Sequence, residues 1–319
     1  MERLDAFMAR ANAAFYAAPD PLAHFTTAPE ISQAFGECLG LWAAVTWQQM
    51  GSPAPVWLVE LGPGRGTLMA DASRAIVEMA PDFAAAARIA LVETSPGLRE
   101  RQRAAVPAAH HFATAEEVPP GPAIILANEF FDALPIRQFI RRGGAWMERW
   151  VADGGFAERP ADITLPDAVE GSVAEVAEAA HAVVRGLAAR IARDGGAALI
   201  LDYGPAASGF GDTLQAIRRH ASADPLAAPG EADLTAHVDF TGLACAAVGT
   251  AVHGPLPMGL FLQRLGLVSR AAMLARSSPQ NAGLILSGAQ RLVAAEGMGS
   301  LFKALCLGQQ GAPVPPGFE

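Results

Sequence analysis

The feature that most constrains the fold is a short apolar run that ends in three alternating glycines. Residues Val56–Leu61 read VWLVEL, and Gly62, Gly64 and Gly66 follow at every second position. A short apolar run bounded by glycine is typical of a strand covered on both faces. Glycine permits a sharp turn with positive φ and lets a ligand approach the backbone without meeting a Cβ atom. The stretch therefore predicts a strand, a ligand-binding turn and a following helix.

Three later apolar runs repeat this pattern at Arg88–Glu93, Ala123–Phe130 and Ala197–Gly204. Helical stretches are expected over Gly66–Met79 and Pro96–Ala105, between the runs. Strands that alternate with helices indicate a parallel sheet with helices on both faces. We therefore predict an α/β fold with a mostly parallel, doubly wound sheet.

The pattern changes between the third and fourth runs. Residues Arg137–Val151 contain a Gly-Gly pair between alternating segments, which predicts a β-hairpin. A long helix is expected next, with Ser172 as its cap, Glu175 completing a capping box and Gly195 as its end. The following region is rich in glycine, proline and short helices, so we expect it to form an added lobe.

The composition excludes several classes of protein. The chain has 319 residues, of which 51% are hydrophobic and 17% charged, as in globular proteins. Its formal net charge of −9, without a basic run that includes aromatic residues, disfavours binding to nucleic acid or anionic lipid. We therefore expect no nucleic-acid partner.

The cysteines and the apolar segments bear on location. Cys38, Cys245 and Cys306 are odd in number and far apart, which predicts neither a disulfide framework nor a zinc site. The first residues make a poor signal peptide, and Gly242–Leu262 is interrupted by a histidine and two prolines. The histidines show no metal-ligand spacing. We therefore expect a cytoplasmic chain with no membrane span and no metal.

The glycine turn is compatible with few ligands. A Walker A loop is excluded because PGRGTL, the sequence after Gly62, contains no lysine. A dinucleotide site would prefer a third glycine where Thr67 stands. The spacing GxGxG is common to methyltransferases that use S-adenosylmethionine (SAM). Glu93, at the carboxyl end of the second expected strand, could bind both ribose hydroxyls of either ligand.

The third strand ends in a segment that distinguishes better between a methyltransferase and a dinucleotide-binding protein. ANEFFDALP contains Asn128, Glu129, Phe130, Phe131 and Asp132. Methyl transfer is an in-line displacement, so the acceptor must be oriented and shielded from water. The phenylalanines could exclude water, Asn128 could hold a nitrogen nucleophile, and the two acids could pair with a cationic one. This combination favours methyl transfer to nitrogen.

Seven segments together carry a family resemblance, and they run in family order over nearly the whole chain. The segments are FTTAPEISQAFGE (Phe25–Glu37), VELGPGRGTLMAD (Val59–Asp71), LVETSP (Leu91–Pro96), LANEFFDALPIRQF (Leu126–Phe139), LILDYG (Leu199–Gly204), GDTLQAIRRH (Gly211–His220) and PGEADLTAHVDF (Pro229–Phe240). The chain resembles the MidA-like SAM-dependent methyltransferases. Mitochondrial members of that family are protein arginine methyltransferases and assembly factors of respiratory complex I.

The resemblance implies a Rossmann-like methyltransferase core with an added mixed lobe, and SAM as the cofactor. It implies four functional regions. Residues 1–50 would close over the cofactor, 51–210 would form the core with a hairpin insertion, 211–308 would form the added lobe and a final returning strand, and 309–319 would be an extended tail.

Site residues follow from the same resemblance. The residues expected to bind the cofactor are Thr26, Thr27, Glu60, Gly62, Pro63, Gly64, Arg65, Gly66, Glu93, Thr94 and Asn128. The expected catalytic residues are Asn128, Glu129, Asp132 and Glu30. The residues expected to bind the acceptor are Phe130, Phe131, Asp202 and His237.

The leading hypothesis is a SAM-dependent methyltransferase that acts on an arginine of a protein substrate, a subunit of respiratory complex I or a similar partner. One alternative is a non-catalytic assembly factor that binds SAM or no ligand. The other is a nicotinamide-dependent oxidoreductase. Its catalytic Tyr/Lys arrangement is missing, because the two tyrosines are Tyr16 and Tyr203 and no lysine follows the latter at the required spacing.

Overall fold

A seven-stranded sheet forms the centre of the computed structural model, which describes residues 1–18, 21–24 and 26–319. The strand order is β14-β15-β10-β5-β2-β3-β4. The five strands from β10 to β4 are parallel, and β15 is antiparallel to both of its neighbours. The bounds are β2 Val56–Leu61, β3 Ala87–Val92, β4 His110–Phe112, β5 Ala123–Asn128, β10 Gly196–Tyr203, β14 Ala251–Pro257 and β15 Phe302–Gly308.

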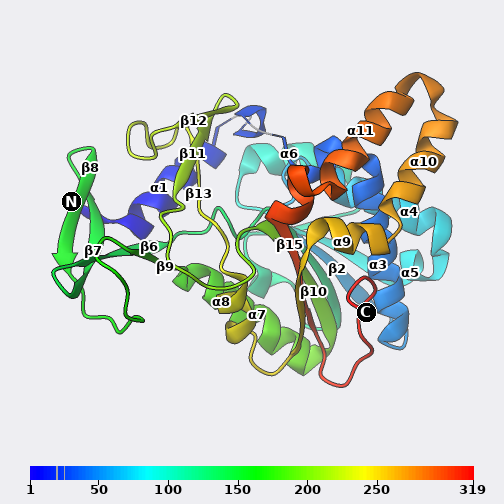
Figure 1. Ribbon diagram of the computed structural model, residues 1–319. Helices are drawn as coiled ribbons and strands as arrows, with labels where there is room; N and C mark the ends of the chain where they lie inside the picture. Colours follow the sequence, from blue (N-terminus) through cyan, green and yellow to red (C-terminus); the bar gives the residue numbers. More distant parts are fainter. Residues whose placement is uncertain (19–20, 25) are drawn as a thin grey trace.

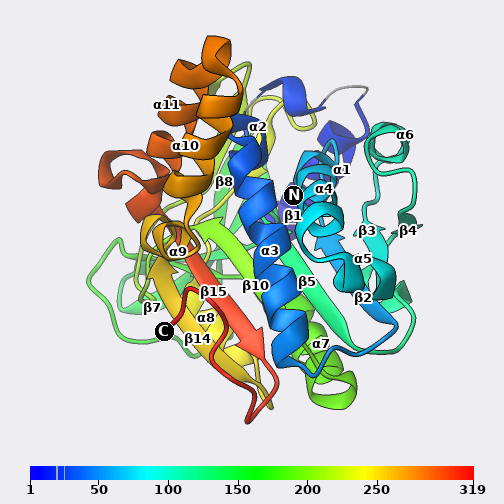
Figure 2. The same cartoon turned by 90° about the vertical axis from the view of Figure 1, so that its right-hand side faces the viewer.

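Helices cover both faces of this sheet (Figures 1 and 2). One face packs against helices that bury Phe35, Trp42 and Phe261, and the other against helices that bury Val184 and Phe240. The first group comprises α3 Gln33–Gln49, α4 Thr67–Met79, α5 Pro81–Ala86, α9 Met258–Arg264, α10 Leu267–Ser277 and α11 Ala282–Val293. The second comprises α7 Glu178–Asp194 and α8 Phe240–Ala246. A further helix, α6, spans Pro96–Ala105. The predicted doubly wound α/β architecture is therefore confirmed.

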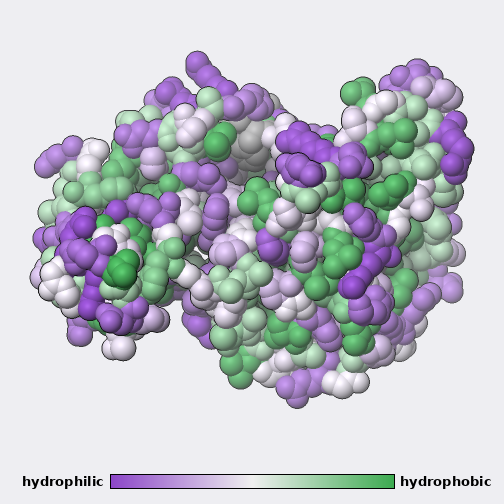
Figure 3. Space-filling view, in the orientation of Figure 1, coloured by the Kyte–Doolittle hydropathy of each residue, from purple (hydrophilic) through white to green (hydrophobic). Residues whose placement is uncertain are grey.

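A second sheet lies beside the central one and includes the first residues of the chain. Its order is β1-β7-β6-β9, with β8 paired to β7. Figure 3 shows this part set off from the main body by an indentation at the lower edge. The bounds are β1 Glu2–Arg3, β6 Arg137–Arg142, β7 Ala145–Ala152, β8 Gly155–Pro160 and β9 Val173–Val176. The predicted hairpin is therefore present as β6 and β7, which pair antiparallel.

Helix α1 (Leu4–Tyr16) connects this sheet to a third, small sheet. The third sheet has the order β12-β11-β13, with bounds Ala221–Ala223, Gln215–Arg218 and Asp233–Thr235. Leu4, Phe7 and Met8 of α1 pack in one core with Val151 of β7 and Leu234 of β13. The first and the middle parts of the chain thus fold together at one end of the central sheet.

The long helix begins later than the sequence suggests. The expectation that it begins at Ser172 is wrong, because Val173–Val176 form β9 and the helix starts at Glu178. Glu175 caps no helix, and its Oε1 accepts hydrogen bonds from Gln138 Nε2 at 2.7 Å and from Thr213 N at 2.8 Å. Pairing with β6 thus outweighs a local capping signal. The predicted end at Gly195 is confirmed, with φ +81°.

The region 211–308 divides between two parts of the molecule. Its first part forms the small sheet beside α1, whereas its later part supplies two strands and four helices to the main body. The tail after β15 folds back onto the helical layer, where Trp42 Nε1 donates to Pro316 O at 3.2 Å and the Phe318 ring lies 5.1 Å from that of Phe261. Within the described ranges, no helix has the length and apolarity that a membrane crossing requires.

Candidate functional site

The site lies where the carboxyl ends of four parallel strands meet. Leu61 at the end of β2 is in register with Val92 of β3 and with Ala127 of β5. Leu201 of β10 is in register with Asn128. The glycine turn, Glu93, the NEFFD segment and Asp202 therefore converge on one edge of the sheet, as is usual for ligand sites in open parallel sheets.

The glycine turn has the conformation that its sequence suggests. Gly62, Gly64 and Gly66 have φ values of +62°, +54° and +84°. A Cβ atom on Gly62 would lie 3.0 Å from the Phe130 ring, and one on Gly64 would lie 3.1 Å from Leu22 Cδ1. Helix α4 begins directly after the turn, so its free N–H groups lie beside it. The turn, closed by a hydrogen bond from Gly66 N to Pro63 O of 2.7 Å, is a backbone cradle that other residues would fill or strain.

Glu60 lies beneath this cradle and is only 3% exposed. The backbone of Met69 donates to its carboxyl group, while Oε2 has no hydrogen-bond partner within the described part of the chain. Burial raises the pKa of Glu60 to about 8. A buried polar atom without a partner is rare, and such an atom beside a glycine cradle fits a ligand-binding role.

Glu93 is connected to the glycine turn through a residue that the sequence did not single out. Its Oε1 accepts from Ser95 N at 2.8 Å. Gln102 Nε2 donates both to Glu93 Oε2 at 3.3 Å and to Gly64 O at 2.7 Å. Burial raises the pKa of Glu93. Gln102 lies on α6 and is fully buried, so it holds the Glu93 carboxyl group and the glycine turn in one arrangement. Thr94, next to Glu93, is exposed.

A short helix, α2 (Ala28–Ile31), lies over the glycine turn. Thr67 Oγ1 donates to Glu30 Oε1 at 2.7 Å, and Arg65 Nη1 lies 3.5 Å from Glu30 Oε2. Glu30, expected among the acids that face the acceptor, therefore connects α2 to the turn. Of the preceding segment, Thr26 is exposed, Thr27 is the N-cap residue of α2, and Phe25 lies outside the described residues.

The NEFFD segment is held by Asp202, which is completely buried. Its Oδ2 accepts from the backbone N–H groups of Phe130, Phe131 and Asp132 at 3.2, 2.9 and 3.3 Å. Its Oδ1 accepts from Tyr203 N at 2.9 Å. Burial and the nearby Asp132 raise the pKa of Asp202, and the N–H donors oppose this rise by stabilising the charged carboxylate. In the structure Asp202 orients the loop, and its contact with the acceptor stays a prediction.

Glu129 has a strained backbone, with φ +50°. Its Oε1 accepts from Ala28 N at 2.8 Å and from Asn128 Nδ2 at 3.1 Å, which joins the NEFFD segment to α2. Asn128 is buried, and its Oδ1 has no hydrogen-bond partner among the residues described. Burial raises the pKa of Glu129 to about 7, and the nearby Asp132 acts in the same direction.

Two further aspartates complete the site. Asp132 is hydrogen-bonded to Tyr203, and Asp233 Oδ1 accepts from Tyr16 Oη at 2.9 Å. Burial raises the pKa of Asp132 to about 6 and that of Asp233 to about 7. His237 lies nearby, with its ring 5.6 Å from the ring of Tyr203.

Sequence reasoning missed Asp233 and both tyrosines as members of this site. Asp233 lies in the family-like segment PGEADLTAHVDF, which was a signal that could have found it. Tyr16 gave no such signal, because α1 reaches the site only through the tertiary fold. Among the described residues no group of three metal-ligating side chains occurs.

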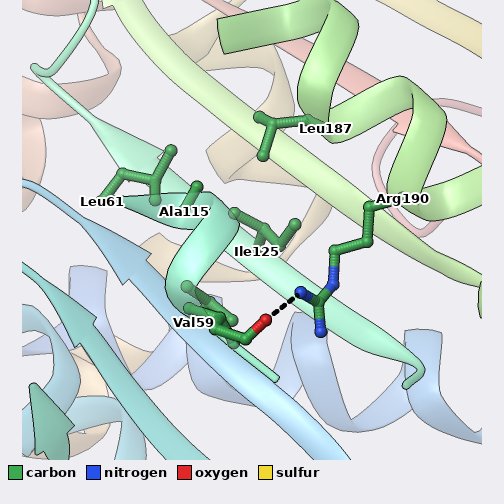
Figure 4. Close-up of a pocket in the computed structure, with 7 residues that line it drawn as sticks. Val59, Leu61, Ala115, Ile125, Leu187 and Arg190 are labelled. Atoms are coloured by element: carbon green, nitrogen blue, oxygen red, sulfur yellow. Dashed lines mark hydrogen bonds between the residues drawn. The ribbon is translucent and has the colours of Figure 1, made fainter. Parts of the chain in front are cut away.

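Two cavities of the molecule lie away from this edge. The smaller, of about 10 Å³, is an apolar gap between the sheet and α7, beside Arg190, which donates to Val118 O at 2.9 Å (Figure 4). The larger, of about 670 Å³, is an open groove at the amino ends of the strands, lined by Trp57, Arg88 and several prolines. Neither contains the converging carboxyl groups.

Comparison with known proteins identifies the family. A family model described as an S-adenosyl-L-methionine-dependent methyltransferase matches residues 38–256. The chain is 37% identical to a protein from Drosophila melanogaster named protein arginine methyltransferase NDUFAF7 homolog, mitochondrial, over 89% of this chain and 74% of that protein. It is 33% identical to the Homo sapiens protein arginine methyltransferase NDUFAF7, mitochondrial, over 89% of this chain and 73% of that protein.

A solved structure agrees with this assignment. A COG1565 superfamily member from Burkholderia thailandensis, bound to S-adenosyl-homocysteine, superposes with a TM-score of 0.86 at 27% identity. The match covers 99% of this chain and 89% of that chain. The glycine cradle, the Glu93 carboxyl group and the unpartnered atoms of Glu60 and Asn128 fit such a ligand. The cofactor is therefore SAM, which decides against the nicotinamide alternative.

The relatives also correct one expectation. They are named as mitochondrial proteins, which contradicts the cytoplasmic location that we expected from the sequence. Free cysteines, one of the features behind that expectation, do not distinguish one reducing compartment from another. The family match, the relatives and the glycine cradle lead to one conclusion: the chain belongs to the SAM-dependent methyltransferases of the MidA-like family.

Proposed function

We propose that this methyltransferase acts on the guanidinium group of an arginine in a protein substrate, and that the substrate is a subunit of respiratory complex I whose assembly it supports. The observation that carries the proposal is a set of three carboxyl groups beside the glycine turn: Asp132 and Asp233 are buried, and Glu129 is half-buried. No ion pair of the described residues includes any of the three. Relatives that are named protein arginine methyltransferases support the same acceptor.

Electrostatics favours a cationic acceptor at this place. Burying several carboxylates together without a cation is costly, and the cost falls when a positive group enters among them. A guanidinium group keeps its charge at any physiological pH because its pKa lies above about 12. Its planar set of N–H donors also matches carboxylate oxygens in pairs. The site therefore suits arginine as the group to be methylated.

Each part of the site has a role in this proposal. The glycine turn from Gly62 to Gly66, with Pro63 and Arg65, would hold the cofactor together with Glu60 and Glu93. Thr26, Thr27 and Thr94 would contact it from the surface. When bound, SAM supplies an electrophilic methyl group on a sulfonium. Glu30 would hold α2 closed over it.

The acceptor nitrogen gains a methyl group and loses one proton, so the site must orient that nitrogen and receive the proton. Asn128 Oδ1 and the carboxylates of Glu129 and Asp132 would orient the N–H groups, and one of these carboxylates would accept the proton. Phe130 and Phe131, whose rings lie 5.3 Å apart, would exclude water, with His237 at the rim. Correct orientation contributes much of the rate in such a displacement.

Calorimetry and methyl transfer together test the proposal. S-adenosylhomocysteine should bind the native protein, NADH should not, and Gly64→Val should abolish the binding because its side chain would meet Leu22. Labelled SAM with isolated complex I subunits should then give methylarginine. Glu129→Gln and Asp132→Asn should each lower kcat by about 100-fold or more. Label on another residue type, or none despite cofactor binding, would refute the acceptor that we propose.

A further inference from the structure

The chain contains only two tyrosines, and both bind aspartates of the acceptor site. Tyr16 is the last residue of α1, and its hydroxyl donates to Asp233 Oδ1 at 2.9 Å. Tyr203 is the last residue of β10, and its hydroxyl is hydrogen-bonded to Asp132 and accepts from Gln215 Nε2 at 3.1 Å. Segments that are far apart in the sequence thus supply two similar Tyr–Asp pairs.

Helix α1 fixes the position of both aspartates. Asn12 precedes Tyr16 by four residues and therefore lies on the same face of the helix. Its Nδ2 donates to Ala133 O at 3.0 Å and to Leu234 O at 2.8 Å, while its Oδ1 accepts from Leu234 N at 3.0 Å. Ala133 follows Asp132 and Leu234 follows Asp233. One buried amide thus holds the backbone beside each carboxyl group.

The two carboxyl groups act within one electrostatic environment. Burial raises the pKa of Asp233 most, and the nearby Asp132 and Glu129 raise it further. Asp132 also raises the pKa of Tyr16. Tyr16 occupies Oδ1 of Asp233, and in the described part of the molecule no group donates to Oδ2. Asp233 is 6% exposed, so it is screened from bulk water. Its second oxygen is available to a donor that enters the site.

We propose that the Tyr16–Asp233 pair is a second arm of the acceptor pocket, and that together with the Tyr203–Asp132 pair it selects a planar guanidinium over a lysine ammonium. This inference rests on the proposed arginine acceptor. A guanidinium presents donors in a rigid plane and can bind two separate carboxylates at once. An ammonium is a compact, strongly hydrated charge, so two carboxylates that are each fixed by a tyrosine hydroxyl suit it less well.

The two tyrosines make a direct spectroscopic test possible. Protein with ring-labelled tyrosine and saturating S-adenosylhomocysteine should show two sets of tyrosine NMR signals, and Tyr16→Phe assigns them. N-acetyl-arginine methylamide should shift both sets in a saturable manner. N-acetyl-lysine methylamide at the same concentration should shift neither. Unmoved signals with the arginine probe, or equal shifts with both probes, would overturn the inference.

Enzyme kinetics provides a second, independent test. Asp233→Asn should raise the KM for an arginine peptide by about tenfold or more, the effect of losing a hydrogen bond to a charged group. The affinity for S-adenosylhomocysteine should change less than twofold. Asp212→Asn, which removes a surface carboxyl group that pairs with Arg149, is the matched control and should change neither quantity. An unchanged KM, or a parallel loss of cofactor affinity, would show that Asp233 is only structural.

The two proposals can fail separately. If the native protein yields no methylarginine, the proposed function fails, whatever the tyrosine signals do. If it methylates arginine while Asp233→Asn leaves the KM for the peptide unchanged, only the second arm of the pocket fails.

Discussion

Two buried acids of this site differ in the number of donors that oppose the effect of burial. Burial raises the pKa of both Asp202 and Glu60. Asp202 receives four backbone N–H bonds, which stabilise its charged form. Glu60 receives one from the backbone of Met69, and its pKa lies at about 8. Asp202 therefore acts as a loop anchor, and Glu60 as a group that is neutral until a ligand or a higher pH ionises it.

The stability of the protein should reveal this property of Glu60. Its pKa in the folded state lies above the ordinary value, so its contribution is complete below that ordinary value and is lost as the pH rises to about 8. Glu60→Gln removes the ionisable group, so the variant does not lose stability in this way as the pH rises. In thermal unfolding without cofactor, the Tm of the variant relative to the native protein should increase from pH 5 to pH 8. A difference in Tm that does not change with pH would contradict the buried neutral carboxyl group.

Acceptor binding should depend on pH for a related reason. Burial raises the pKa of Glu129 and Asp233 to about 7 and that of Asp132 to about 6, so these groups are partly protonated near neutrality. A guanidinium binds their charged forms. The KM for an arginine peptide should therefore fall as the pH rises from 6 to 8, and binding should release protons.

Calorimetry in buffers of different ionisation enthalpy measures the released protons. Asp233→Asn should release fewer of them than the native protein. A KM that is constant over this range would contradict the raised values. The other titratable groups that interact with these acids, and that must be considered in fitting the profile, are Tyr16, Tyr203, Asp202 and Arg291.

At the scale of elements, local signals located the strands well. Val56–Leu61 was predicted without error, and α6 has the predicted bounds Pro96–Ala105, because an apolar run or a capped helix carries its own signal. The start of α7 was missed because β9 exists only by pairing with β6. The same limit explains which residues of the site the sequence could predict. The glycine turn and Glu93 follow local patterns, whereas Asn12 and Tyr16 reach the site through packing of α1, which no local pattern encodes.

The anchoring of α1 leads to a prediction. Asn12→Ala removes three hydrogen bonds to the backbone of Ala133 and Leu234, two of them buried. We expect the free energy of unfolding to fall by about 2–4 kcal/mol, measured by urea denaturation. Asn281→Ala, which removes one exposed hydrogen bond to Ser278, is the control and should change it by less than about 0.5 kcal/mol. Equal effects of the two variants would contradict the anchor.

The role of α2 can be separated from catalysis in the same way. Glu30 connects α2 to Thr67 and Arg65, so Glu30→Ala should weaken S-adenosylhomocysteine binding by about three- to tenfold. At saturating cofactor kcat should stay within twofold of the native value. Glu78→Ala, on the exposed side of α4, should change neither quantity. A large loss of kcat with unchanged cofactor affinity would instead support the predicted role of Glu30 as a catalytic acid.

At the scale of the whole molecule, the site is assembled from parts that lie far apart in the chain. The central sheet supplies the glycine turn, Glu93 and the NEFFD segment, while α1 and β13 bring Tyr16 and Asp233 from the added sheets. In the proposed site the core would supply the cofactor contacts, and the added parts would supply Tyr16 and Asp233 to the acceptor pocket. This division explains how one cofactor fold can serve different acceptors, since the added parts can change while the sheet edge remains.

The charge of the whole chain should act on the encounter with a basic acceptor. A formal net charge of −9 and a cluster of buried acids create a negative field that attracts cations. Salt screens such a field, with a Debye length near 30 Å at 0.01 M and about 10 Å at 0.1 M. The KM for an arginine peptide should therefore rise several-fold between 20 and 200 mM salt, over which the Debye length falls from roughly 20 Å to roughly 7 Å. The affinity for S-adenosylhomocysteine, which carries no net charge, should change little and serves as the internal control. If the KM does not depend on salt, short-range contacts in the pocket account for acceptor binding without help from the field.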